Sequence, residues 1–421
     1  MRLPLAIYDP NPVRNEYLSQ MYFDSIVAYL NESGVNVTRI CDLDGVRDST
    51  ILINGDFLTP DVIVRLKQGG NILISFDIND SSFLTGAYRF EQEALQIDLI
   101  LKIAGIQKSN TNDDLAIDKD FNFTLKQRNF LPYDAWSTYS TMASRRTLQS
   151  LPYVPWVNPD VVPKPYAERS GKVLVKGGNH FYRFMVFLNL LKRGFADANS
   201  SFHTADYFGS TMRQDLKYCP ECVDARSNNK NVSPYRVGGK PTDCQSQAKW
   251  GDEGFDLEDY TTANHWNNKC PRSFYWLAAQ FEKRHGPLDH GLLETALNGA
   301  FQSQHDFLEG LSKATFYTDL KWWPSIYAPP RFWESAAAGT INFLPNRTND
   351  QTFFPHIQEG YHYMTFLEDF TRFNPEISPS RYEEMAGHCM GLFKTWIQPG
   401  RYKISANLIR HILSEIEIVN G

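Results

Sequence analysis

Apolar residues in the first 80 positions fall into short continuous runs that alternate with amphipathic stretches. Runs with the length of buried strands lie at 3–8, 35–40, 50–54 and 71–76, and stretches with helical spacing lie at 16–30 and 60–67. Strands that alternate with helices usually pair in parallel, so this half predicts an α/β unit. Asp9 and Asp77 each follow a run, and we expect both at the carboxyl edge of the sheet.

The same alternation returns after residue 172. An apolar run leads into Gly177 and Gly178, and a helical face follows, which Gly194 closes. Further predicted segments are helices at 273–283 and 292–311, a strand at 314–319, a helix–strand unit at 331–344, and helices at 380–397 and 405–418. The fold class predicted is therefore α/β with two Rossmann-like domains.

Irregular sequence separates and interrupts these units. Residues 105–165 are rich in Asn, Asp, Pro and aromatics, and a group of prolines near their end predicts an interdomain crossing. The expected domains are 1–165 and 166–400, with a polar insertion near 203–270, followed by a C-terminal helix at 401–421.

Composition narrows the class of protein. A chain of 421 residues, 42% of them hydrophobic, is long enough for two cores. The 42 Lys and Arg face 48 Asp and Glu without a long basic run, which argues against nucleic acid as a partner. No segment approaches the roughly 20 apolar residues that span a bilayer. The run before Asp9 reads as a strand and not as a signal peptide, so we expect a cytoplasmic protein.

The cysteines leave two interpretations open. Cys219 and Cys222 flank a Pro-Glu turn that resembles a zinc knuckle, but Cys244 and Cys270 lack the paired spacing of a zinc ribbon. Unligated thiols are therefore favoured over a structural zinc. Two further cysteines, Cys41 and Cys389, are expected to be buried.

The stretch around 330–344 carries the most specific pattern. Arg331 and Glu334 open a helix of small residues, Gly339 ends it, and Thr340 leads into an apolar strand. A carboxylate at Glu334 suits the two hydroxyls of a ribose, and Arg331 suits a phosphate. The alternative is a helix whose alanines merely pack.

The turn after residue 176 is a second candidate for anion binding. Backbone N–H groups at a helix start after Gly178 suit a phosphate or a sugar carboxylate, with His180 and Arg183 as side-chain helpers. The alternative is an ordinary strand–helix turn in which the two glycines only permit close packing.

Together these segments resemble the C-terminal half of the CgeB-like and group 1 glycosyltransferases of the GT-B class. The resemblance covers about 172–194 and 306–397, and includes the run from Pro330 to Thr340 and the segments 354–360 and 363–370. It implies two Rossmann-like domains facing each other across a cleft, and transfer of a sugar from a nucleotide-activated donor to an oligosaccharide or glycolipid acceptor. This activity would serve bacterial surface-polysaccharide assembly, with peripheral membrane association through the acceptor.

The resemblance also implies roles for individual residues. Glu334 would bind the ribose, Gly339 and Thr340 would bring amides near the donor, and Gly178 with Asn179 would face the diphosphate. The cations expected to stabilise the departing phosphate are Arg183, Lys321 and Arg331, so no metal or cofactor is required. Many retaining members carry a second Glu eight residues before the first, where this chain has Ile326, so the stereochemical outcome is left open.

The general base or nucleophile is not determined by the pattern. The candidates are Asp9, Asp24, Asp77, Asp80 and His180, with Asp206 or Asp224 as nucleophile if the donor is CMP-Kdo. Each carboxylate could equally cap a helix or lie at the surface. Two other classes compete with the enzyme: a non-catalytic GT-B-like nucleotide or glycan-binding module, and a zinc-stabilised interaction protein.

Overall fold

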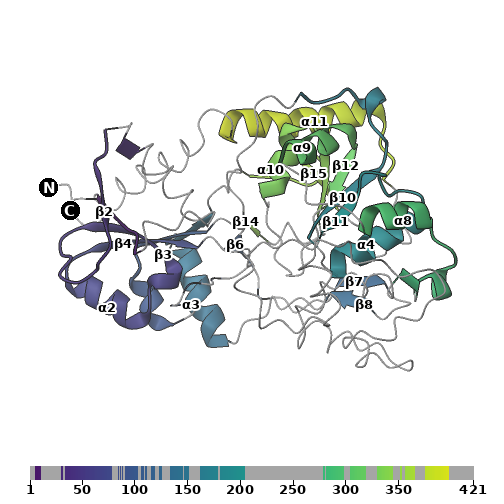
Figure 1. Cartoon of the computed structure of the whole chain (residues 1–421). Coiled ribbons are helices and arrows are strands. Elements are labelled where there is room, and N and C mark those ends of the chain that lie inside the picture. The colour runs from purple at the N-terminus through teal and green to yellow at the C-terminus, as the bar shows by residue number, and fades with distance from the viewer. Residues whose placement is uncertain are drawn as a thin grey trace, which may run out of the picture.

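The computed structural model contains two parallel β-sheets with helices packed against them (Figure 1). The structure describes residues 5–10, 30–31, 34–77, 84, 86, 88, 91–102, 106–108, 110, 115–118, 123–125, 133–145, 147–150, 162–178, 181–203, 278–279, 281–297, 304–318, 330–344, 351–352, 356–365 and 375–397. The strands of the first sheet all come from residues 5–150 and those of the second from 173–365. The α/β class predicted from the alternating pattern is confirmed.

The first sheet has six strands in the order β2-β1-β3-β4-β5-β9, and every pairing is parallel. Its strands are β1 (Leu5–Tyr8), β2 (Val37–Ile40), β3 (Thr50–Asn54), β4 (Ile72–Asp77), β5 (Leu99–Lys102) and β9 (Leu148–Ser150). The strand order reverses between β1 and β3, which makes this the topological switch point of the sheet.

Helix α2 (Pro60–Gln68) shows how the sequence sets an element's ends. Thr59 caps it, its hydroxyl oxygen accepting from the amide of Val62 at 3.4 Å, and Pro60 takes the first helical position. Buried Ile63 and Leu66 place this helix in one core with α3 (Tyr133–Ser144) and strands β3, β4, β5 and β9. The 3₁₀ turns η1 (Gly55–Phe57) and η2 (Gln92–Gln96) complete this half.

The second sheet has five parallel strands in the order β11-β10-β12-β13-β15. They are β10 (Val173–Gly178), β11 (Ser201–His203), β12 (Phe316–Thr318), β13 (Ile341–Leu344) and β15 (Tyr363–Thr365). The switch point here lies between β10 and β12. The strand register aligns Val173 with Phe316 and Phe316 with Ile341. This alignment gives the height of each loop along the strands.

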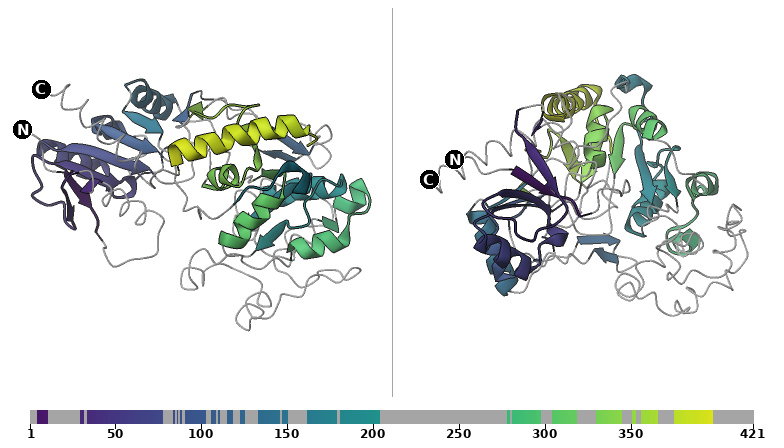
Figure 2. Two further views of the ribbon diagram at one scale, coloured as in Figure 1. Left: turned by 90° about the horizontal axis from the view of Figure 1, so that it is seen from above. Right: turned by 60° about the vertical axis from the view of Figure 1, so that its left-hand side comes forward.

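Helices cover both faces of this sheet. One face packs against α4 (Phe181–Lys192), α8 (His290–Leu297) and part of α11 (Pro379–Leu392). The other face presents Leu174 and Tyr317 to α9 (Gln304–Lys313). Helix α10 (Pro330–Ala337) packs between α9 and α11, and α11 can be followed along it in Figures 1 and 2. A π-helical turn, η8 (Phe393–Ile397), continues α11, and the 3₁₀ turn η3 (Tyr166–Glu168) precedes β10.

Regular structure also occurs where the sequence predicts irregular chain. Residues 105–165 include α3, β9, the antiparallel pair β7 (Leu115–Asp118) and β8 (Phe123–Leu125), and the short strand β6 (Ile106–Gln107). Strand β6 pairs antiparallel with β14 (Gln351–Thr352), which follows β13 in the chain. Short strands without strong alternation are hard to recognise in a sequence, because they gain their stability from long-range pairing. The interdomain crossing predicted from the prolines falls mostly on residues 151–161, which lie outside the described part of the chain.

Candidate functional site

The carboxyl edge of the second sheet, at its switch point, is where this topology leads us to look first. Ligands of doubly wound sheets bind outside the strand ends at which the order reverses. β10 ends there at Gly177 and Gly178, and β12 ends at Thr318. Helix α4 begins three residues after β10, so its amino end lies at the same edge. The two strand ends and this helix start define the candidate site.

A buried arginine lies directly on the glycine turn. Arg183, in the first turn of α4, is 3% exposed. A β-carbon added to Gly177 would lie 2.6 Å from its Nη1 atom, and the φ of this glycine is +148°. Only glycine combines this backbone angle with room for the guanidinium. The sequence pattern that joined the two residues therefore corresponds to direct packing, and their role as ligands stays a prediction.

Helix α10 carries the two other charged residues of the pattern. Arg331 is half-buried, with its Cζ 4.7 Å from the ring centre of Phe307 on α9. Glu334 is 8% exposed, and Ala336 beside it is fully buried. Burying a carboxylate this deeply is costly unless polar groups pair with it. The side chain of Glu334 therefore depends on polar partners for its place in the protein.

Lys176, on β10 just before the glycines, is a basic residue that the sequence reasoning missed. It is 4% exposed, and a β-carbon on Gly310 of α9 would lie 2.8 Å from its Nζ. Burial lowers the pKa of Lys176 below its ordinary value, and the negative charges of Asp197 and Asp306 oppose that effect in part. A lysine that ends an apolar strand run was the signal available in the sequence.

The structure contradicts the expected role of Gly339 and Thr340. Both precede β13, whose first residue pairs with the start of β12, so they lie at the amino edge of the sheet. Gly178 lies five positions beyond Val173, the residue in line with Ile341, which at about 3.3 Å per residue is about 16 Å further along the strands. Gly339 and Thr340 therefore cannot contact the same phosphate as Gly178.

The switch point of the first sheet combines aromatic and charged side chains. Tyr8 at the end of β1 packs edge-on against Phe57, with ring centres 5.7 Å apart, and Phe57 is 43% exposed. Asp9 follows β1, as predicted, and its Oδ2 lies 3.3 Å from Nη1 of Arg39. Burial, together with the charges of Asp42 and Cys41, raises the pKa of the Tyr8 hydroxyl.

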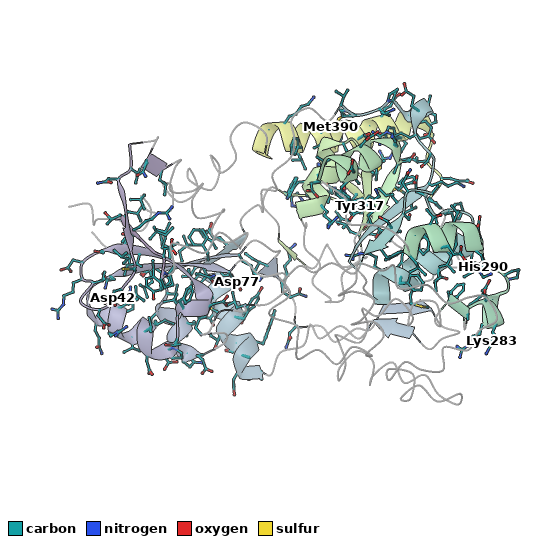
Figure 3. All side chains as sticks on the ribbon, in the orientation of Figure 1. Asp42, Asp77, Lys283, His290, Tyr317 and Met390 are labelled. Atoms are coloured by element: carbon teal, nitrogen blue, oxygen red, sulfur yellow. The ribbon has the colours of Figure 1, made fainter. Side chains whose placement is uncertain are left out.

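Asp77, the other carboxylate at this edge, is enclosed by protein. It ends β4 next to Lys102 of β5, with Oδ2 and Nζ 3.5 Å apart and neither side chain exposed (Figure 3 labels Asp77). The nearby hydroxyls of Ser75 and Tyr88 are 3.1 Å apart. Burial raises the pKa of Tyr88, and the negative charge of Asp77 adds to this. Asp77 is at the predicted edge but lies inside a polar cluster of the core.

Several predicted residues lie outside the described part of the chain. These are Asp24, Asp80, Asn179, His180, Asp206, Asp224 and Lys321, with the zinc candidates Cys219, Cys222, Cys244 and Cys270. Of the other two cysteines, Cys389 is buried as expected, whereas Cys41 is exposed because it directly follows the edge strand β2. Within the described ranges, no group of three His, Cys, Asp or Glu side chains is arranged to hold a metal ion.

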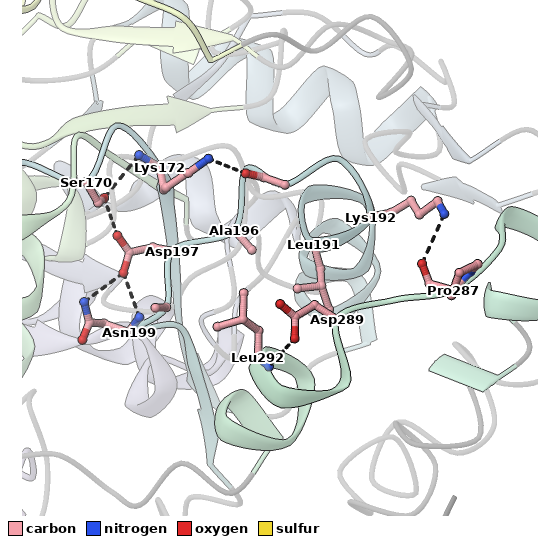
Figure 4. Close-up of a pocket in the computed structure, with 12 residues that line it drawn as sticks. Ser170, Lys172, Leu191, Lys192, Ala196, Asp197, Asn199, Pro287, Asp289 and Leu292 are labelled. Atoms are coloured by element: carbon pink, nitrogen blue, oxygen red, sulfur yellow. Dashed lines mark hydrogen bonds between the residues drawn. The ribbon is translucent and has the colours of Figure 1, made fainter. Parts of the chain in front are cut away.

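A cavity of about 540 Å³ opens at the opposite, amino edge of the second sheet (Figure 4). Polar side chains that line the cavity form hydrogen bonds with neighbouring residues of its wall. Lys172 donates to the carbonyl oxygen of Gly194, and Asp197 accepts from the Ser170 hydroxyl and the Asn199 amide (2.8 Å). These pairings, drawn as dashed lines in Figure 4, leave the carboxyl edge as the better candidate site.

Comparison with known families and curated proteins identifies no relative of this chain. No protein-family model matches the chain, and a search of curated proteins finds no significant match. Among the helices that the structure describes, none is long and apolar enough to cross a membrane.

Proposed function

We propose that the protein transfers a sugar from a nucleotide-activated donor to a glycan acceptor, and that the donor binds at the carboxyl edge of the second sheet. The observation that carries this proposal is the packing of the buried Arg183 guanidinium on Gly177 at the switch point. A glycine turn lets a phosphate approach the backbone, and the amino end of α4 favours negative charge there. The same edge of an α/β sheet is where nucleotides usually bind.

The cations near this edge support the departing phosphate in the proposal. Glycosyl transfer passes through an oxocarbenium-like state, and negative charge grows on the leaving diphosphate. Arg183 and Arg331 are guanidinium groups held by packing, so they need little reorganisation to stabilise that charge. Glu334 is the carboxylate proposed for the ribose hydroxyls. CMP-Kdo is one donor of this kind.

For the acceptor, we propose the switch point of the first sheet. Tyr8 and Phe57 present aromatic surface to a sugar ring, and Asp9, whose side chain is 21% exposed, has the access that a general base needs. Asp77 is disfavoured for that role because its side chain is fully enclosed and paired with Lys102. His180 and Asp224 stay predictions.

A thermal-shift series with UDP, GDP, dTDP and CMP tests the proposal. A nucleotide that binds only the folded state stabilises it by about 2.7 kcal/mol when its concentration is about 100 times its Kd, and so raises the melting temperature. Arg183→Lys should reduce the shift because lysine loses the planar fork, whereas Arg193→Lys, beyond the other end of α4, should not.

Turnover assays with the corresponding nucleotide sugars then separate enzyme from binding module. Transfer or donor hydrolysis supports the enzyme. Binding without turnover on any acceptor supports a non-catalytic module, and no shift with any nucleotide contradicts both.

A further inference from the structure

Arg169 connects the segment that leads into the second sheet with two helices of that half. The residue is 8% exposed. Its Nε donates to the carbonyl oxygen of Lys164 at 2.8 Å, its Nη1 to that of Ala314 at 2.6 Å, and its Nη2 to that of Ala338 at 2.7 Å. Nη1 also lies 3.4 Å from the carbonyl oxygen of Leu311 and 3.3 Å from the Thr340 hydroxyl.

Apart from Lys164, the carbonyl acceptors lie at the carboxyl ends of α9 and α10. The last carbonyl groups of a helix have no partner within it, and the helix dipole makes that end negative. A guanidinium has five N–H donors in a fixed fork, so one side chain can satisfy carbonyls from both helices. Lysine has a single ammonium and cannot span the same set.

Tyr382 of α11 completes the arrangement. Its ring centre lies 5.1 Å from the Arg169 Cζ, and its hydroxyl donates to the carbonyl oxygen of Gly339 at 2.6 Å. Burial lowers the pKa of Arg169, while the charge of Tyr382 acts to raise it. The pKa of Tyr382 rises to about 12, mainly through burial. The Tyr382 hydroxyl therefore stays protonated, and able to donate, at neutral pH.

Gly339 and Thr340 are shaped around this arginine. Gly339 has a φ of +69°, and a β-carbon there would lie 3.1 Å from Nη2 of Arg169. The Thr340 hydroxyl also donates to the carbonyl oxygen of Leu311 at 2.5 Å. Residues 338–340, which follow α10, thus surround the guanidinium group of Arg169.

We infer that Arg169 is a positioning residue, which fixes α10 along its axis and so sets where Arg331 and Glu334 lie beside the second sheet. The eight residues of α10 span only about 12 Å, so a cap at one end fixes the other. The inference rests on the proposed function, because Arg331 and Glu334 are its donor ligands. Arg169 itself lies at the amino edge of the sheet, away from the proposed binding site of the nucleotide sugar.

The test combines Arg169→Lys with a double-mutant cycle. We expect Arg169→Lys to weaken nucleotide binding about tenfold, the size expected when a charge-assisted hydrogen bond is misplaced, with UDP, GDP, dTDP and CMP as probes. In a Glu334→Ala background the same substitution should have a clearly smaller effect, since the carboxylate through which it acts is gone. Equal effects in both backgrounds, or lower stability with unchanged affinity, would overturn the inference.

Hydrogen exchange provides a readout that does not depend on nucleotide binding. In Arg169→Lys the amides of residues 330–340 should exchange faster, while those of the first sheet keep their protection. Tyr382→Phe, which removes one hydroxyl, should give the same change to a smaller degree if Arg169→Lys does not fold. Unchanged exchange in 330–340 would overturn the inference. Absence of nucleotide binding in the unmodified protein would instead contradict the proposed function.

Discussion

Arg183 packs on Gly177 so closely that the glycine has no space for a side chain: a β-carbon would lie 2.6 Å from Nη1. The two residues are six positions apart: Gly177 is the second-last residue of β10, and Arg183 is in the first turn of α4. A strand end and a helix start are thereby locked together by one cation. In the proposed function, this guanidinium and the amino end of α4 attract the phosphate of the donor.

Gly177→Ala should therefore cost stability and nucleotide affinity together. The backbone angle alone costs about 1–3 kcal/mol for a residue with a side chain, and the new methyl group must also displace Arg183. Gly171→Ala is the matched control, because Gly171 has a φ of +66° but open space around it. Urea unfolding should show a cost in both variants, and only Gly177→Ala should lose nucleotide binding. Equal affinities in the two variants would contradict the assignment of this turn.

Glu334→Ala should weaken nucleotide binding by about 1–3 kcal/mol through the loss of charge-assisted hydrogen bonds to the ribose. Glu334→Gln keeps the side-chain volume and should lose less affinity than the alanine variant. Titration calorimetry with the preferred nucleotide measures both, beside their unfolding free energies. An affinity that stays unchanged while stability drops would make Glu334 a structural residue of α10.

Lys102→Met should destabilise the protein by about 3–5 kcal/mol, because it leaves the carboxylate of Asp77 buried without its cation. Asp77→Asn combined with Lys102→Met should recover much of that loss, since no uncompensated charge is left. Unfolding free energies of the two single variants and the double variant give the coupling. Additive losses would show that the two side chains do not depend on each other.

A disulfide between positions 107 and 351 should form readily. Gln107 and Gln351 are register partners in the antiparallel pair β6–β14, where opposed Cα atoms are about 4.5–5.5 Å apart, within the range that a disulfide spans. Mass spectrometry of Gln107→Cys/Gln351→Cys after mild oxidation detects the bond. Lys108→Cys/Gln351→Cys is the control with shifted register and should crosslink less. Equal crosslinking would argue against this pairing.

His362 should make stability fall in mild acid. Burial, with the charges of His388 and His356, lowers its pKa from 6.5 to about 4, and its Nδ1 accepts from the Gln358 amide at 2.9 Å. Between these two pKa values the unfolded chain binds the proton more readily, so stability is lost as the pH falls from 6.5 towards 4. His362→Asn retains an acceptor and does not titrate, so urea unfolding at several pH values should show a shallower loss. An identical slope would contradict this origin.

The local elements could be read from the sequence because short-range rules determine them. Thr59 and Pro60 begin α2, and the apolar runs at 50–54 and 71–76 form β3 and β4, because capping and continuous burial depend on neighbouring residues. The same rules found the strand, glycine turn and helix from Val173 to Lys192.

Tertiary structure decided which of these residues share a site. Gly339 and Thr340 are close to Arg331 in the chain, but they precede β13 and so lie at the amino edge of the sheet. There Arg169 donates to the carbonyl oxygen of Ala338 and to the Thr340 hydroxyl. Asp77 has the expected place at a strand end, yet Lys102 from the neighbouring strand encloses it. Lys176 lies near the end of β10, but the packing of α9 over its ammonium group is what buries it. Sequence records spacing along the chain, whereas strand direction and long-range packing determine which side chains meet.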